Sequence, residues 1–405
     1  MTNGIKVLHI LSLDTPAGTE CSFYQILVND SAGVLEHHVL LARGPCHPDF
    51  RPGVRQHARS LHLAKYWNGL KLPRRPAFLR RRQLDKAFKS VRPDVTILYN
   101  CLGNLDVAEA AAEHSGACVY WERGSAWTSP AAEDVAAFLH RMDAVLCNSH
   151  ACKRMLELRW GADSRKITVR HNPLRCDLPN QDAAPRKTGA SHPLRLGIIG
   201  RMTPIKGFPL ALHAAQRLVE RGLPCELHVV GTGPDDAALR NLAGHLHIDK
   251  CVRFGGHVND LTDFYRGIDI LLCPSIREPF GNVCAEAAHF GLPVIGALVD
   301  GIPETVLHEK TGLCLPPTLP FEDYKALGGT VENLPEWTYD PRKDCLSKPS
   351  ILDPASIADA VMALADNRDS ADRLGAAARE FVATHRRFDD YLGWFHDVMG
   401  RLVKA

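Results

Sequence analysis

The sequence has little net charge and no long apolar run. Its 405 residues carry a formal net charge of only +2, so the protein as a whole creates no electrostatic field that would attract nucleic acid. A membrane-spanning helix needs roughly 20 consecutive apolar residues, and no stretch of the chain approaches that length. We therefore expect a cytoplasmic protein with no nucleic-acid partner, which touches a membrane only at its surface.

Cysteine patterning is also missing. The 13 cysteines are scattered singly, with no Cys-x-x-Cys pair and no regular spacing, which excludes the usual zinc-knuckle and disulfide-framework patterns. Free and mostly buried thiols in a reducing compartment are the expected state.

The amino terminus lacks two further signals. Residues 5–13 form an apolar run that is broken by His9 and closed by Asp14. No small-residue cleavage site follows, so the run predicts a first β-strand rather than a secretory signal. A Gly-x-Gly-x-x-Gly sequence is absent after this strand, which counts against a nicotinamide-dependent oxidoreductase.

Short apolar strands alternate with helical patterns over most of the chain. This alternation predicts an α/β fold with parallel sheets covered by helices, and 45% hydrophobic content is enough for two cores. The polar, Pro-bearing segment 179–193 separates two series of strands, so we predict domains over residues 1–178 and 194–387. The predicted strands are 6–13, 38–42, 95–100, 117–122, 144–149 and 167–171 in the first domain and 194–200, 225–231, 252–255, 269–275, 293–298 and 312–315 in the second.

Two segments near the carboxyl end depart from the alternation. Residues 317–354 are Pro-rich and charged, and we interpret them as an insertion. From Ile357 onward the pattern is helical. The last helix, in residues 388–405, has an apolar face that packs on one of the two domains. That face consists of Tyr391, Trp394, Phe395 and Val398.

Two glutamates flank a Phe-Gly turn in the second domain. Glu278 lies in the loop after a predicted strand, and Glu286 lies in the first turns of the helix predicted over 282–290. A helix that begins at the carboxyl end of a parallel strand presents backbone N–H groups that favour phosphate. Two carboxylates beside it can accept hydrogen bonds from hydroxyls, which suits a nucleotide sugar. The alternative is ordinary, because glutamate is common in loops and early in helices, where it complements the helix dipole.

Two cations lie on another strand-to-helix loop. Gly200 and Arg201 end a predicted strand, and Lys206 precedes a helix that begins near Pro209. Loop cations of this kind are usually solvated. Beside the two glutamates, Arg201 and Lys206 would stabilise the charge that develops on a departing diphosphate.

Residues 194–316 resemble the donor-binding half of glycosyltransferase family 4. The matching segments, in the family's order, are Gly200-Arg201 with Lys206-Gly207, Val230-Gly231-Thr232-Gly233, Val252-Arg253-Phe254-Gly255, Glu278 to Glu286, Gly291-Leu292-Pro293-Val294-Ile295 and Gly301-Ile302-Pro303-Glu304. The resemblance implies two facing Rossmann-like domains with an interdomain cleft, the GT-B fold, in which the last helix packs on the amino-terminal domain. The implied activity is retaining transfer of a sugar from a nucleotide diphosphate sugar to a glycan or lipid-linked acceptor, in the assembly of a bacterial surface polysaccharide or lipopolysaccharide core.

The resemblance also implies roles for individual residues. Glu278 would accept hydrogen bonds from hydroxyls of the donor sugar, and Glu286 from the ribose. Arg201 and Lys206 would replace a divalent metal, so neither a metal nor a cofactor is expected beside the donor. The residues implied in catalysis are Arg201, Lys206, Glu278 and Glu122, and those implied in nucleotide-sugar binding are Gly18, Gly200, Arg201, Lys206, Gly231, Phe280, Gly281, Asn282, Val283 and Glu286.

The amino-terminal half matches the family less well. Family members often carry a histidine pair at the strand end where this chain has Trp121, Glu122 and Arg123. Glu122 would orient the donor or acceptor, or be structural. Gly18 would let a helix start approach the diphosphate, and Gly231 would border the nucleotide, although each also fits a plain turn. A non-catalytic sugar-nucleotide-binding protein and a sugar-nucleotide epimerase or phosphorylase are the alternative functions.

A basic run occupies residues 71–82 of the amino-terminal half. Tyr66 and Trp67 precede it and Phe88 follows it, and the run mixes cations with Phe and Leu. Segments that lie on anionic membrane surfaces have this composition. We predict that the run docks on the inner membrane face or binds a phosphorylated lipid-linked acceptor. A solvated helix face is the alternative.

Overall fold

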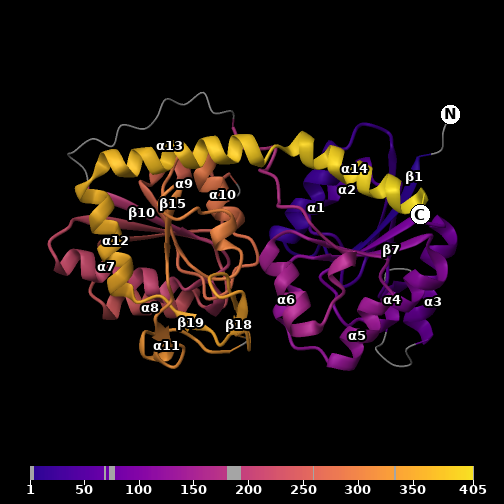
Figure 1. The fold of residues 1–405 in the computed structure, drawn as a ribbon, viewed down its shortest axis with the longest axis horizontal. Helices are drawn as coiled ribbons and strands as arrows, with labels where there is room; N and C mark the ends of the chain where they lie inside the picture. Colours follow the sequence, from indigo (N-terminus) through magenta and orange to yellow (C-terminus); the bar gives the residue numbers. More distant parts are fainter. Residues whose placement is uncertain are drawn as a thin grey trace. The chain divides into compact units, whose positions relative to one another are not determined.

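The chain folds into two compact α/β units. The computed structural model describes residues 4–67, 70–72, 78–179, 193–258, 260–332 and 334–404. One unit contains the chain up to Cys176 together with the helix that begins at Phe388, and the other runs from Asp177 to Arg387 (Figure 1). The predicted linker, 179–193, falls almost entirely on residues 180–192, which lie outside the described residues.

A parallel sheet of seven strands forms the centre of the first unit, in the order β3-β2-β1-β6-β7-β8-β9. Its strands are β1 (Ile5–Leu11), β2 (Leu35–Leu41), β3 (Ser60–Leu63), β6 (Val95–Tyr99), β7 (Ala117–Glu122), β8 (Ala144–Cys147) and β9 (Ile167–Val169). Every residue of β6 and β7 is buried, as expected for central strands covered on both faces. The edge strand β3 has no buried residue, so it lacks the apolar pattern from which the other strands are predicted.

Helices cover this sheet, and a small two-stranded antiparallel hairpin is separate from it. The helices are α1 (Gly18–Asn29), α2 (Arg51–His57), α3 (Phe78–Val91), α4 (Leu105–His114), α5 (Ala132–His140), α6 (His150–Trp160) and α14 (Phe388–Lys404), and the hairpin strands are β4 (Tyr66–Trp67) and β5 (Leu70–Lys71). Capping fixes both ends of α6: Ser149 Oγ accepts the Cys152 N–H at 3.0 Å, and Gly161 ends the helix at φ 65°.

Helix α14 belongs to the first unit and packs against β1 and β6. Its buried residues are Tyr391, Phe395, Val398 and Met399. The Phe395 ring stacks on Trp121 of β7 with a centroid distance of 5.6 Å. No helix in the described part of the chain is both long enough and apolar enough to cross a membrane.

The second unit contains a six-stranded parallel sheet in the order β12-β11-β10-β13-β14-β15. Its strands are β10 (Leu194–Ile199), β11 (Cys225–Val230), β12 (Val252–Gly256), β13 (Ile270–Cys273), β14 (Val294–Ala297) and β15 (Gly312–Leu315). Its main helices are α7 (Phe208–Glu220), α8 (Asp236–His245), α9 (Thr262–Gly267), α10 (Asn282–His289), α12 (Pro354–Asp366) and α13 (Arg368–His385). All six strands predicted for this domain are present, and their ends differ by at most two residues.

The segment interpreted as an insertion, 317–354, has structure of its own. It forms two small antiparallel pairs, β16 (Leu319–Pro320) with β19 (Ser350–Ile351) and β17 (Thr338–Asp340) with β18 (Cys345–Ser347), and the short helix α11 (Asp323–Ala326). Figure 1 shows α11, β18 and β19 grouped on one side of the second unit. Tyr324 of α11 is fully buried and donates a hydrogen bond to the Pro204 carbonyl at 2.8 Å. The insertion therefore packs against the loop that follows β10.

Candidate functional site

The order of strands in the second sheet identifies a site at its carboxyl edge. From β10 the chain first adds β11 and β12 on one side and then adds β13, β14 and β15 on the other. Open parallel sheets bind ligands at the carboxyl ends of the strands where the order reverses. That point lies between β10 and β13, so the loops after these two strands are the expected binding elements. They carry the predicted residues Gly200 to Lys206 and Glu278 to Gly281.

The loop after β10 is shaped by two glycines. Gly200 and Gly207 have φ values of +151° and +67°, in the region that favours glycine. A Cβ on Gly207 would lie 2.1 Å from the Pro274 carbonyl oxygen, so this loop can approach the β13 loop only with glycine there. A Cβ on Gly231, at the end of β11, would lie 1.9 Å from the Gly200 carbonyl oxygen. Gly231 thus allows two strand-end loops to touch, and its contact with a nucleotide stays a prediction.

Lys206 and Glu278 form an ion pair at this edge. The Lys206 Nζ lies 2.5 Å from Glu278 Oε2, and only 8% of Glu278 is exposed. Burial alone would lower the pKa of the Lys206 ammonium, but the adjacent carboxylate raises it above its usual value. The structure therefore pairs a cation expected to hold phosphate with an anion expected to hold sugar hydroxyls. Arg201, in the same loop, is exposed.

The Phe-Gly turn ends in a helix, as predicted. Gly281 has a φ of +89° and precedes α10, whose first residues are Asn282 and Val283. The Phe280 side chain is buried, and the Arg386 guanidinium lies 5.4 Å from its ring centroid. This buried ring anchors the turn, so the backbone N–H groups at the start of α10 have a fixed direction, which is the condition for binding an anion there.

Glu286 is oriented by a tyrosine that the sequence does not reveal. Only 7% of Glu286 is exposed, and its Oε2 accepts a hydrogen bond from the Tyr265 hydroxyl at 2.8 Å. Tyr265 lies on α9 and stacks on Phe290 with a centroid distance of 5.1 Å. In the sequence it reads as one more apolar residue of a helix, and no local pattern indicates that its hydroxyl reaches Glu286.

Asp300 is a second residue that no sequence pattern indicates. It follows β14, is 1% exposed and has a φ of +46°. Its Oδ2 accepts the Glu278 backbone N–H at 3.1 Å. Together, the loops after β10, β13 and β14 bring Lys206, Glu278 and Asp300 into contact.

The remaining predicted residues, Gly18 and Glu122, lie in the first unit. Gly18 is exposed at the start of α1. Glu122 is fully buried at the end of β7. Its carboxylate accepts hydrogen bonds from the Tyr120 hydroxyl, the Gly124 N–H and the Ser125 hydroxyl. These bonds hold the turn after β7, which favours the structural alternative for Glu122; a catalytic role stays a prediction.

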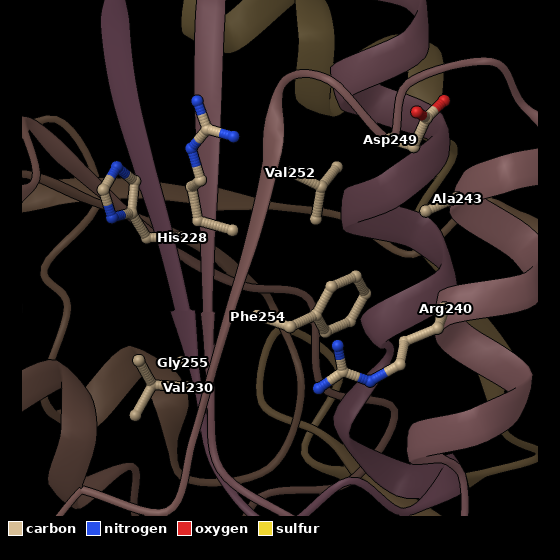
Figure 2. Close-up of a pocket in the computed structure, with 9 residues that line it drawn as sticks. His228, Val230, Arg240, Ala243, Asp249, Val252, Phe254 and Gly255 are labelled. Carbon is tan, nitrogen blue, oxygen red and sulfur yellow. The ribbon is translucent and has the colours of Figure 1, made fainter.

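A separate cavity of about 480 Å³ lies along the edge strand β12. Figure 2 shows Phe254 beside the Arg240 guanidinium, whose central carbon lies 4.5 Å from the ring centroid. The cavity is lined by His228, Val230, Arg240, Ala243, Asp249, Val252, Arg253, Phe254 and Gly255. Because it contains none of the predicted site residues, we place the functional site at the Lys206–Glu278 pair, where charges and a helix start converge.

One protein family matches the part of the chain that contains this site. Residues 193–334, which contain the Lys206–Glu278 pair and Glu286, match the family described as Glycosyl transferases group 1. The matched residues lie within the second unit. Similar proteins include D-inositol 3-phosphate glycosyltransferases of Corynebacterium efficiens, 36% identical over 130 residues, and of Saccharomonospora viridis, 38% identical over 154 residues. These alignments cover 30% and 35% of this chain and 31% and 35% of the relatives, so the chain spans about a third of the length of these relatives.

A further similar protein is named for colanic acid biosynthesis. A putative colanic acid biosynthesis glycosyltransferase, WcaL of Escherichia coli, is 28% identical over 166 residues, 39% of this chain and 40% of that protein.

Solved glycosyltransferase structures match the whole chain. Anabaena HepE in complex with UDP and glucose has a TM-score of 0.73 at 16% identity, over 98% of this chain and 99% of its own. WaaG, a glycosyltransferase involved in lipopolysaccharide biosynthesis, has a TM-score of 0.65 at 14% identity, over 97% and 99% of the two chains. At such identities the likeness shows the fold alone. The predicted class, two Rossmann-like domains of the GT-B type, is confirmed.

Proposed function

We propose that this protein is a retaining glycosyltransferase that moves a sugar from a nucleotide diphosphate sugar to a glycan or lipid-linked acceptor. The observation that carries the proposal is the Lys206–Glu278 pair beside the start of α10, at the point where the strand order of a glycosyltransferase group 1 domain reverses. A diphosphate and a polyhydroxylated sugar need a cation, N–H donors and a carboxylate in close succession, and these loops supply all three.

Donor binding rearranges the ion pair. The diphosphate competes with Glu278 for Lys206, and a hydroxyl of the sugar replaces the ammonium as the donor to the Glu278 carboxylate. The Glu286 carboxylate, oriented by Tyr265, accepts hydrogen bonds from the ribose hydroxyls. Arg201 and Lys206 neutralise the leaving diphosphate in place of a divalent metal. We propose that no metal or cofactor takes part.

The chemistry of the proposed reaction is displacement with retention. The bond between the sugar carbon and the diphosphate oxygen breaks, and the acceptor hydroxyl forms the new bond from the same face. The acceptor's proton passes to a departing phosphate oxygen. In this scheme catalysis consists of positioning the two substrates and stabilising charge on the leaving group.

Surface glycan assembly is the proposed setting. WcaL is named for colanic acid biosynthesis and WaaG for lipopolysaccharide biosynthesis, and HepE was crystallised with UDP and glucose. These proteins support a nucleotide sugar as donor and a bacterial polysaccharide or lipopolysaccharide core as product.

We further propose that the basic run contacts the inner face of the membrane. Residues 73–77 of the run lie outside the described residues. Around them, Leu70 and Phe78 are 72% and 63% exposed, and Lys71 and Arg82 are exposed. Arg81 is instead paired with Asp85 at 2.9 Å. Exposed apolar side chains beside unpaired surface cations fit an anionic lipid surface.

A ligand panel tests the proposed activity. Purified protein is mixed with UDP-glucose, UDP-galactose, UDP-N-acetylglucosamine or GDP-mannose, and thermal unfolding and release of nucleoside diphosphate are measured. A ligand at a hundred times its dissociation constant stabilises by about 2.7 kcal/mol. A transferase shows both a shift and slow release, whereas a binding protein shows only the shift and an epimerase converts the sugar without release. A protein that none of the four ligands stabilises would contradict the proposed function.

A further inference from the structure

We propose that Asp300 and the hairpin β17–β18 brace the loop that carries Glu278, so that the inserted segment is part of the donor site. The inference rests on the proposed function, since it assigns Glu278 to the donor sugar. It gives Asp300 a positioning role, because Asp300 acts through Glu278.

Asp300 connects the two elements through its two carboxylate oxygens. Oδ2 accepts the Glu278 N–H at 3.1 Å, and Oδ1 accepts the Tyr339 N–H at 2.8 Å. The Asp300 N–H in turn donates to the Tyr339 carbonyl at 3.0 Å. One buried side chain thus holds a loop 22 residues before it and a hairpin 39 residues after it.

The backbone of Asp300 is strained where its side chain makes these two contacts. Its φ of +46° lies in the left-handed region, which is unfavourable for a residue other than glycine, although Asp tolerates it better than most. A carboxylate that is 1% exposed also needs hydrogen-bond partners to offset its burial. The Glu278 and Tyr339 N–H groups supply these bonds, so the strain is maintained by the same contacts that hold the Glu278 loop.

The hairpin directs the backbone N–H and C=O groups of Tyr339 toward Asp300. Tyr339 lies in the middle of β17, opposite Leu346 of β18. In an antiparallel pair, alternate residues point both backbone polar groups away from the partner strand, and Tyr339 points its N–H and C=O at Asp300. The Tyr339 hydroxyl donates to Asp344 at 2.9 Å, and Arg342 pairs with Asp340 at 3.1 Å. These bonds within the hairpin keep its shape.

The Glu278 loop is held on its other sides as well. The Gly301 N–H donates to the Glu278 carbonyl at 3.0 Å, and a Cβ on Gly301 would lie 2.2 Å from the Pro279 carbonyl oxygen. The Glu278 side chain is fixed by Lys206. If a donor diphosphate draws Lys206 away, the backbone contacts from Asp300 and Gly301 are what keep the carboxylate in place to meet the sugar.

The Asp300→Asn substitution tests the brace. Asparagine keeps the shape but replaces one accepting oxygen by an NH₂ group, which cannot accept either N–H. We expect turnover of the best panel donor to fall by about a hundredfold, as misplacement of a contact by about 1 Å does. Affinity for the matching nucleoside diphosphate, which lacks the sugar, should not change. Asp235→Asn is the matched control, because Asp235 accepts a hydrogen bond from Thr330 of the insertion at 3.2 Å but makes no contact with Glu278.

A double-mutant cycle shows whether Asp300 acts through Glu278. In a Glu278→Ala background, Asp300→Asn should cause no further loss of turnover. Asp300→Gly, which relieves the positive φ but removes both acceptors, should reproduce the kinetic defect even if the asparagine variant folds poorly. Normal turnover in both Asp300 variants, or an equal loss with and without Glu278, would overturn the brace while leaving the glycosyltransferase proposal intact. A wild-type protein with no donor turnover would overturn the proposed function, and the brace with it.

Discussion

Lys206 is the residue on which the proposed chemistry depends most directly. Replacing Lys206, Arg201 or Glu286 by Ala should lower turnover by two to three decades, because loss of a preorganised charge contact costs roughly 2.7 to 4 kcal/mol in the transition state. Turnover of the best panel donor measures the effect. Arg221→Ala is a suitable control, since Arg221 pairs with Asp359 on the exposed surface. Wild-type turnover in the three site variants would show that the site lies elsewhere.

His9 is a residue whose burial links stability to pH. Its Nδ1 lies 3.0 Å from the Tyr99 hydroxyl and its Nε2 lies 2.9 Å from His37 Nδ1. His37 and His396 both reach the Asp30 carboxylate at 2.9 Å. Burial, together with the neighbouring His37 and His38, lowers the pKa of His9 well below its usual value. The native state therefore keeps His9 neutral at a pH where the unfolded chain protonates it.

The sign of the pH effect follows from this shift. A histidine with a lowered native pKa contributes full stability above its unfolded pKa, about 6.5, and stability is lost as pH falls below it. One such group changes the unfolding free energy by about 1.4 kcal/mol per pH unit. We expect denaturation measured at pH 7.5, 6.5 and 5.5 to show declining stability, and His9→Gln to show a shallower decline. His245→Gln, at an exposed site on α8, is the control; equal slopes in all three proteins would contradict this assignment.

At the scale of elements, the strands are predictable and several contacts are not. The twelve predicted strands are all present, most of them with buried apolar residues, and the helix after the Phe-Gly turn begins where predicted, at Asn282. Strand β3 has no buried residue, and β17 and β18 are three residues each, too short for a periodic signal. Strands that are this short, or that bury none of their residues, leave little trace in the sequence.

Some residues of the candidate site can likewise be predicted from the sequence, and others cannot. Lys206, Glu278 and Glu286 are found because each lies at a fixed place relative to a strand end or a helix start. Tyr265 and Asp300 are missed because their partners are distant in sequence, 21 and 22 residues away for Glu286 and Glu278. The sequence places Glu122 at a strand end but does not show that three donors in its own turn occupy the carboxylate.

For the whole molecule, the charge at the Arg201–Lys206 loop predicts independence from metal. Two cations there should do what a divalent ion does in other transferases. We expect donor turnover in EDTA to equal turnover in magnesium or manganese. Activity that EDTA abolishes and either ion restores would contradict the proposal that side chains replace the metal.

The proposed membrane contact is also tested on the whole protein. Each cation close to an anionic surface contributes about 1 kcal/mol, so sedimentation with phosphatidylglycerol vesicles should require the anionic lipid and fall with added salt. A variant with Leu70, Phe78 and Arg82 changed to Ser should lose this binding. Val219→Ser, at a 46% exposed site on the second unit, should not. Binding that ignores salt and the triple change would leave residues 71–82 as ordinary surface charge.

The last helix, α14, belongs to the first unit although it follows the second unit in the sequence. The first unit can therefore be completed on the ribosome only after the second unit has been synthesised. The core of the first unit includes Tyr391, Phe395, Val398 and Met399, yet these residues are synthesised only after the entire second unit, Asp177 to Arg387. Domains generally fold as their own residues emerge. The second unit can therefore reach its native state first, while the apolar surface over β1 and β6 stays uncovered until α14 has been synthesised.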